Sequence, residues 1–170
     1  MNRSYPLRSL RLGGRCSRRF AAKLSYKGLG VEIMATGLET YGWDGEGYRP
    51  LVFSSDWQVA ILNWEPAADP ARLGKVERHV GTDEVFVLLR GRAVLFTWSD
   101  AGEFALVEAA PGVVYNVTAG TWHSVITTTG ASWIIVEARD THLHGTEMRP
   151  MTPGERAELL GRLPAWAQPA

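Results

Sequence analysis

A succession of short apolar runs separated by turn residues constrains the fold of this chain most. From about residue 50 onward, segments rich in Val, Ile, Phe and Trp alternate with Gly, Pro, Asp and Ser, which is typical of strands joined by tight turns. The predicted strands are Leu51–Ser54, Trp57–Trp64, Lys75–His79, Glu84–Arg90, Ala93–Trp98, Phe104–Ala109, Val113–Val117, His123–Thr128 and Trp133–Arg139. No predicted helix between them could form a parallel crossover, so the pattern predicts an all-β antiparallel sandwich or barrel.

One helix is expected after the strands. Thr152 is a good N-cap, Pro153 suits the first helical position, and Glu155 completes a capping box. The apolar face and the end of this helix are assigned to Leu159, Leu160, Leu163 and Pro164. We expect the helix to pack on the outside of the barrel or on a partner subunit.

The length of 170 residues suits one folded domain with a full core. We divide the chain into a basic leader at 1–35, a β-barrel domain at 36–150, and a C-terminal helix and tail at 151–170. The leader holds the one cysteine, Cys16, so an intramolecular disulfide or a thiolate metal site is excluded. Three interpretations of the leader stay open: a start upstream of a true first residue at Met34, an organellar transit peptide, or a basic arm that binds nucleic acid.

Charge and hydropathy narrow the classes of partner. The formal net charge is zero, but residues 1–33 carry eight Lys and Arg and one acid, so the rest of the chain is acidic. An acidic domain does not favour nucleic acid, and the chain has no apolar run of the roughly 18 residues that span a bilayer. We therefore expect a small-molecule ligand and no nucleic-acid or membrane partner. We also expect a homodimer, and a cytoplasmic location unless the leader directs import into an organelle.

Four side chains form the strongest candidate site: Glu77, His79, Glu84 and His123. Side chains alternate along a strand, so Glu77 and His79 share one face of their strand. His79 and Glu84 would meet across the loop of residues 80–83. His123 follows a turn at Gly120, where a positive φ is easily adopted. Two imidazoles and two carboxylates could bind a metal or serve as an acid–base set.

The spacing of these residues resembles the cupin family. The first cupin block reads His-x-His, three or four residues, Glu, six residues, Gly; here Glu77-x-His79, four residues, Glu84, six residues and Gly91 fit that frame. The second block reads Gly, five residues, Pro-x-Gly-x-x-His, three residues, Asn. The matching positions are Gly112, Thr118, Gly120, His123 and Thr127. Across about residues 50–140 the resemblance implies a cupin-like antiparallel β-barrel or jelly roll. The departures from the frame lie at Glu77, Thr118 and Thr127.

Within that family the short motifs resemble ureidoglycolate lyases. Those enzymes tend to carry Glu-Arg-His, then Gln-x-Phe, and later Gly-x-Trp-His. This chain has Glu77-Arg78-His79, Glu84-Val85-Phe86 and Gly120-Thr121-Trp122-His123, so Glu84 stands at the Gln position. The resemblance implies a lyase that releases urea and glyoxylate.

Other polar residues are secondary candidates. Lys75 shares the face of Glu77, and Glu137 and Arg139 share a face of the last predicted strand; these three are candidates for substrate binding, although an exposed Glu137–Arg139 pair is the expected alternative. His142 and His144 form a further His-x-His, which we interpret as a loop feature because no carboxylate follows at cupin spacing.

The leading hypothesis is therefore a small metal-binding cupin that acts on a small polar carboxylate-bearing metabolite. Glu77, His79, Glu84 and His123 would bind one divalent ion, which could be zinc, nickel, manganese or iron. In the lyase form, Glu84 or His79 would act as the base and His123 as the acid. A non-catalytic ligand-binding cupin and an iron-dependent dioxygenase are the alternatives, since a fold alone does not determine function.

Overall fold

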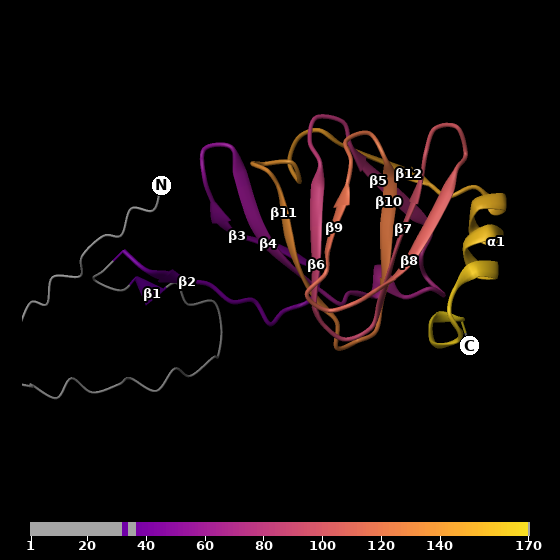
Figure 1. Ribbon diagram of the computed structural model, residues 1–170, viewed down its shortest axis with the longest axis horizontal. Helices are drawn as coiled ribbons and strands as arrows, with labels where there is room; N and C mark the ends of the chain where they lie inside the picture. Colours follow the sequence, from indigo (N-terminus) through magenta and orange to yellow (C-terminus); the bar gives the residue numbers. More distant parts are fainter. Residues whose placement is uncertain (1–31, 34–36, 170) are drawn as a thin grey trace, which may run out of the picture.

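A computed structural model describes residues 32–33 and 37–169 of the chain. Its main body is a sandwich of two five-stranded antiparallel sheets, with a two-stranded ribbon near its N-terminal side and one C-terminal helix (Figure 1). The ribbon pairs β1 (Glu32–Ile33) with β2 (Glu39–Thr40). The predicted all-β antiparallel architecture with a short C-terminal helix is confirmed.

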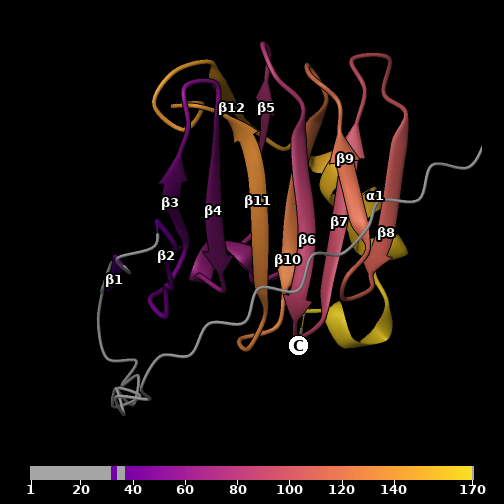
Figure 2. The same ribbon diagram turned by 60° about the vertical axis from the view of Figure 1, so that its left-hand side comes forward.

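The two large sheets interleave strands that lie far apart in the sequence. The sheet that faces the viewer in Figure 2 has the order β3-β4-β11-β6-β9. Its strands are β3 (Tyr48–Phe53), β4 (Trp57–Asn63), β11 (Ser132–Ala138), β6 (Glu84–Arg90) and β9 (Val114–Val117). The second sheet has the order β12-β5-β10-β7-β8. Its strands are β12 (Thr146–Pro150), β5 (Lys75–His79), β10 (Trp122–Thr127), β7 (Ala93–Trp98) and β8 (Phe104–Ala109).

The chain crosses from one sheet to the other at two points that matter for the site. The loop of residues 80–83 joins β5 to β6, and the turn of residues 118–121 joins β9 to β10. Gly120 in that turn has φ 79°, as the sequence predicted. The 3-10 turns Pro66–Ala68 and Ala165–Ala167 complete the described elements.

The strands from β3 to β11 follow the predicted ranges to within a few residues. β12 was not predicted, because Thr146–Pro150 lacks alternating apolar residues and pairs only at the sheet edge with β5. The basic leader and Cys16 lie outside the described residues, as does the proposed first residue, Met34. The three interpretations of the leader stay predictions.

One core lies between the sheets. It is built from alternate residues of facing strands, chiefly Phe86, Leu88, Leu95, Trp133 and Ile135, each less than 5% exposed. The alternation that buries Trp133 and Ile135 also turns Glu137 inward, since residues two apart on a strand share a face.

A second core lies outside the β12-β5-β10-β7-β8 sheet, where α1 (Pro153–Arg162) packs (Figure 1). Thr152 and Glu155 form the predicted capping box, and Leu159 and Leu163 are buried against the sheet with Trp122. The helix therefore covers the outside of the sandwich, as predicted, and Trp122 is a packing residue.

The outer face of the other sheet is apolar. Val85 and Val87 of β6 and Ile134 and Val136 of β11 are partly exposed there, and Leu89 is 49% exposed. The structure therefore places these residues outside the sandwich, where none of the described elements covers them.

Candidate metal centre

The four predicted ligand residues, Glu77, His79, Glu84 and His123, meet at one end of the sandwich. His79 ends β5 and Glu84 begins β6, so the four-residue loop between them brings their side chains together. His123 on β10 lies directly opposite Glu77 on β5. The expected convergence of the two imidazoles and the carboxylates inside the fold is therefore present.

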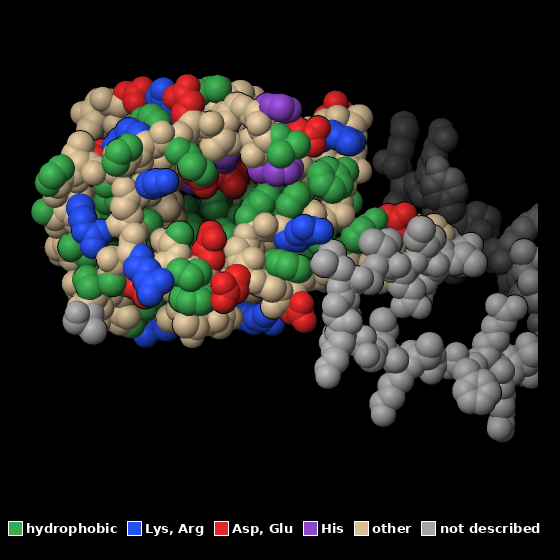
Figure 3. Space-filling view, turned by 180° about the vertical axis from the view of Figure 1, so that it is seen from behind, with side chains coloured by type: hydrophobic (Ala, Val, Ile, Leu, Met, Phe, Trp, Pro, Cys, Tyr) green, Lys and Arg blue, Asp and Glu red, His purple; other side chains and the backbone are tan. Residues whose placement is uncertain are grey.

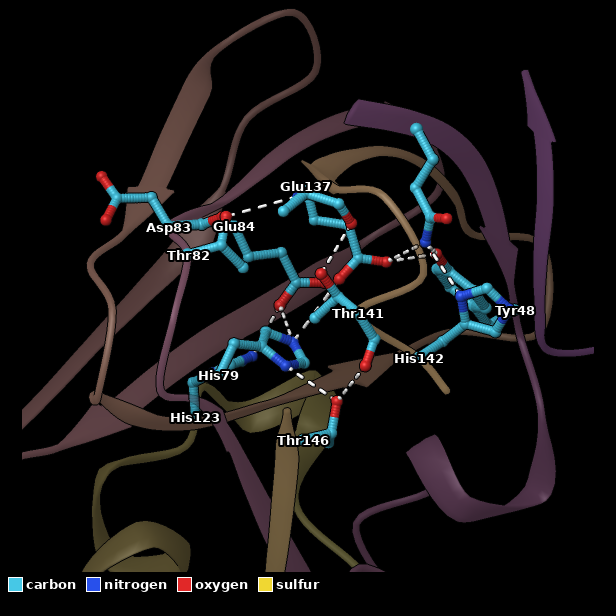
Figure 4. A network of polar contacts seen from close by, with 12 residues as sticks. Tyr48, His79, Thr82, Asp83, Glu84, His123, Glu137, Thr141, His142 and Thr146 are labelled. Atoms are coloured by element: carbon cyan, nitrogen blue, oxygen red, sulfur yellow. Dashed lines mark hydrogen bonds and ion pairs between the residues drawn. The ribbon is translucent and has the colours of Figure 1, made fainter. Parts of the chain in front are cut away.

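One carboxylate oxygen lies at the centre of the cluster. Glu84 Oε2 is 3.0 Å from His79 Nε2 and 2.8 Å from His123 Nε2, and the three residues are all at least 94% buried. The two rings meet edge to face with their centroids 5.4 Å apart. Figure 4 shows both imidazoles turned toward Glu84.

The partners of the other ring nitrogens determine the tautomers. His123 Nδ1 is 2.9 Å from the carbonyl oxygen of Thr121, which only accepts, so this nitrogen carries a proton. His79 Nδ1 is 3.0 Å from Thr146 Oγ1. The Thr146 hydroxyl donates its own proton to the carbonyl of Thr141, so it must accept from His79. Both Nε2 atoms therefore aim a lone pair at Glu84 unless they are protonated too.

In the absence of a metal cation, protonation of the two imidazoles balances the negative charge of Glu84. Burial lowers the pKa of each imidazole, but the hydrogen bond and charge of Glu84 outweigh it and raise the pKa of His79 and His123 above the ordinary 6.5. Burial likewise raises the pKa of Glu84, but hydrogen bonds from His123 and His79 bring it below the ordinary 4.5. An imidazolium–carboxylate pair or a metal cation satisfies the same three atoms.

Two more carboxylates border the cluster. Potential ligand atoms of Glu77, His79 and His123 lie within 4.8 Å of one another, and so do those of His79, Glu84 and Glu137. Burial, followed by the charge of Glu84, raises the pKa of Glu77. The site is therefore rich in acceptors and poor in protein cations.

A hydrogen-bonded network continues from Glu137. Its Oε1 accepts from the Tyr48 hydroxyl and from Gln58 Nε2, which is 2.8 Å away. Gln58 Nε2 is also 2.9 Å from His142 Nδ1, and Gln58 Oε1 accepts from the backbone N–H of Asp140. Burial and the neighbouring Glu137 raise the pKa of Tyr48, so this hydroxyl stays a donor. Figure 4 shows the network beside the histidine pair.

The cluster lies on the wall of a cavity of about 270 Å³. In Figure 3 it is a hollow with acidic and histidine side chains on its wall and hydrophobic side chains around them. The lining residues are Tyr48, Leu62, Asn63, Glu65, Ala67, Ala68, Glu77, His79, Glu84, Phe86, His123, Ser124, Val125, Thr127, Glu137, His142, Thr146 and Met148. A volume near the lower end of known ligand pockets suits a small metabolite.

Lys75 and Arg139 do not belong to this cavity. Lys75 is exposed at the start of β5. Arg139 lies beyond the end of β11, where it donates to the Ser54 carbonyl and lies 3.4 Å from Asp140. The expected exposed Glu137–Arg139 pair is also wrong, because Glu137 is buried and accepts hydrogen bonds from Gln58 of β4 and Tyr48 of β3 in the same sheet.

Sequence reasoning missed Tyr48, His142 and Thr146, which line the cavity, and Gln58, which hydrogen-bonds to Glu137 behind it. Gln58 had a usable signal, since it occupies an inward position of an otherwise apolar strand with Ala60 and Leu62. His142 does lie in a turn, as predicted, yet it reaches the cavity.

The donor set fits a divalent metal. Four ligands at about 2.0–2.2 Å from a tetrahedral ion lie roughly 3.3–3.6 Å apart, so the spacings of 2.8–3.0 Å around Glu84 Oε2 require only a small expansion. Each imidazole also donates its other N–H to a fixed oxygen, which is the usual arrangement around metal-binding histidines.

Comparison with known proteins gives a distant likeness. No family model and no curated protein matches the chain. A cupin-2 domain protein of Shewanella frigidimarina matches with 22% identity and a TM-score of 0.41, over 57% of this chain and 85% of that one. A mutant of Bacillus subtilis oxalate decarboxylase matches with 16% identity and a TM-score of 0.46, over 74% of this chain and 32% of that one.

A third match is the Streptomyces protein PAC13 with uridine, at 12% identity and a TM-score of 0.46, over 68% of this chain and 87% of that one. The chain spans about a third of the oxalate decarboxylase. Likenesses this remote identify neither a family nor a substrate. Within residues 32–33 and 37–169, the helices are too short or too polar to cross a membrane.

Proposed function

We propose that this protein is a metal-dependent cupin enzyme that acts on a small polar metabolite. The observation that carries the proposal is the convergence of His79 Nε2 and His123 Nε2 on Glu84 Oε2, at 3.0 and 2.8 Å, while both Nδ1 atoms donate to other oxygens. Three lone pairs that face one another in a buried place are stabilised by a cation.

His79, Glu84 and His123 would hold the ion, with Glu77 as the fourth ligand. Zinc, nickel, manganese and ferrous iron all accept mixed imidazole and carboxylate ligands. When bound, the ion supplies Lewis-acid stabilisation of charge on a substrate oxygen. The cavity is lined by carboxylates and by no Lys or Arg among the described residues, so a substrate carboxylate would be attracted there by the ion rather than by a protein side chain.

The specific reaction we propose is ureidoglycolate cleavage, on the basis of the short motifs around His79 and His123. A base takes the proton of the substrate hydroxyl, the carbonyl of glyoxylate forms, the C–N bond breaks, and the leaving nitrogen takes a proton to give urea. Glu137 borders the ligand cluster and would be the carboxylate available for these proton transfers if Glu77, His79, Glu84 and His123 are occupied as ligands.

Metal analysis tests the proposal. Protein purified without added metal, and then incubated with Zn²⁺, Ni²⁺, Mn²⁺ or Fe²⁺, should retain one ion per chain, and His79→Ala and His123→Ala should lose it. The matched control is His144→Ala, since His144 is exposed and does not line the cavity. Stoichiometric metal in both site variants would refute the assignment.

The lyase activity needs its own test, independent of metal binding. The metal-loaded protein should release glyoxylate from ureidoglycolate, and His123→Ala should not. No glyoxylate release, in an assay where a control enzyme is active, would exclude the lyase activity but not the metal site. Ligand-induced thermal stabilisation without turnover in a metabolite panel would then favour a non-catalytic binding protein, and oxygen consumption would favour a dioxygenase.

A further inference from the structure

One carboxylate oxygen of Glu137 accepts hydrogen bonds from the described residues, and the other does not. Oε1 accepts from Tyr48 and Gln58. Oε2 accepts no hydrogen bond from any residue that the structure describes, and it lies 3.8 Å from His79 Nε2. The side chain is only 2% exposed and lines the cavity, so Oε2 is a nearly buried acceptor on the cavity wall beside the metal-ligand cluster.

Burying such an acceptor costs free energy unless something donates to it. The network around Oε1 fixes its direction, because Gln58 is held in turn through its Oε1 by the Asp140 N–H. The strands set the same geometry: Glu137 of β11 is paired with Gln58 of β4. Oε2 is therefore a preorganised acceptor.

One unpaired atom of another cavity residue also needs a donor. Asn63 Nδ2 donates to the carbonyls of Trp43 and Gly45, which leaves Asn63 Oδ1 as an acceptor. Asn63 Oδ1 is buried without a hydrogen-bond partner among the described residues, and Asn63 lines the cavity. Because no Lys or Arg of the described chain lines it, the cavity offers acceptors and repels a second negative charge.

We propose that Glu137 Oε2 forms a second subsite, which binds an uncharged, donor-bearing group such as an amide or urea N–H at the far end of a ligand anchored on the metal. This proposal rests on the proposed function, since the metal anchors the other end of the ligand. It narrows the substrate class: one anionic or chelating end, and one end with N–H donors rather than a second carboxylate.

Oxamate and oxalate are matched probes for this subsite. The two have nearly the same size and both chelate metals, but oxamate has an amide in place of one carboxylate. The amide can donate to Glu137, whereas the second carboxylate of oxalate is repelled by it. Affinities of both for the Zn²⁺-loaded protein would be measured by titration calorimetry, after metal content has been checked.

We expect the affinity ratio of oxamate to oxalate to fall by about tenfold or more in Glu137→Gln, with metal content unchanged. Tyr48→Phe, which removes one donor that fixes Glu137, should lower the ratio less, and it keeps the test valid if Glu137→Gln does not fold. The matched control is Glu103→Gln, an exposed acid-to-amide change in the turn between β7 and β8, which should leave the ratio unchanged.

Three results would overturn the subsite. An unchanged ratio in Glu137→Gln and Tyr48→Phe would show that Glu137 does not contact the ligand. Loss of metal from Glu137→Gln would make Glu137 a metal ligand instead. A wild-type protein that holds no metal would overturn the proposed function and the subsite together, whereas metal binding with an unchanged ratio would overturn the subsite alone.

Discussion

At the scale of single residues, proton positions decide the chemistry of the site. The carbonyl of Thr121 and the hydroxyl of Thr146 hold protons on the Nδ1 atoms of His123 and His79. The Nε2 atoms are then free either to bind protons that Glu84 attracts or to bind metal. Metal and protons must therefore compete for the same two nitrogens.

This competition predicts a pH dependence of metal binding. The pKa values of both histidines lie above 6.5 in the metal-free protein, so apparent affinity should still rise as pH increases past that value. The change should be about tenfold per pH unit for each proton displaced. Competition titrations with a chelating dye between about pH 6 and about pH 8 measure it. Affinity that is flat across this window would contradict the assigned protonation.

The same pKa shifts determine how the free energy of unfolding of the metal-free protein changes with pH. A raised histidine pKa stabilises the fold below the unfolded value of 6.5, and this contribution is lost as pH rises through the folded value. The lowered pKa of Glu84 contributes above 4.5 and is lost as pH falls through the folded value. Metal-free protein should therefore lose stability above neutral pH, and bound metal should restore it. Urea unfolding with and without Zn²⁺ at several pH values measures both effects.

Sequence predicted the ligand cluster because its members lie at fixed short offsets. His79 and Glu84 are separated by one loop, and the alternation of strand side chains places Glu77 beside His79. The surroundings of Glu137 could not be predicted. Its partners Tyr48 and Gln58 are 89 and 79 residues away, and a carboxylate without a visible partner is ordinarily expected to be solvated.

At the scale of elements, the turns were more predictable than the sheet edges. Gly91 and Gly120 occur where the chain must adopt positive φ, and β10 begins just after Gly120. By contrast, the sequence of β12 carries no apolar alternation. That strand matters to the site, because its pairing places Thr146 opposite His79.

Gly91 should tolerate substitution far less than Gly102, which lies in the next turn along the chain. Both have positive φ, 81° and 83°, but a Cβ at Gly91 would lie 2.5 Å from Ala131 Cα, whereas nothing lies within 4 Å at Gly102. Gly102→Ala should cost about 1–2 kcal/mol through φ alone, and Gly91→Ala roughly 1–3 kcal/mol more through overpacking. Urea unfolding measures both; equal costs would contradict the close approach of Gly91 to Ala131.

At the scale of the whole molecule, the two sheets have different outer surfaces. α1 covers the β12-β5-β10-β7-β8 sheet, whereas the apolar outer face of the other sheet is uncovered among the described residues. The homodimer expected from the sequence stays a prediction, and this face is its natural interface. Sedimentation should give twice the monomer mass for the wild type and a monomer for Leu89→Lys; a monomeric wild type would exclude it.

A bound cation between His79, Glu84 and His123 would be located directly by anomalous diffraction. Crystals of the Zn²⁺-loaded protein, with data collected on both sides of the zinc edge, should show one peak at about 2.0–2.2 Å from His79 Nε2 and His123 Nε2, with a carboxylate oxygen of Glu84 beside it. A fully loaded protein whose peak lies elsewhere, or crystals in which these three side chains hydrogen-bond to one another and no peak occurs, would contradict the assignment of a metal centre.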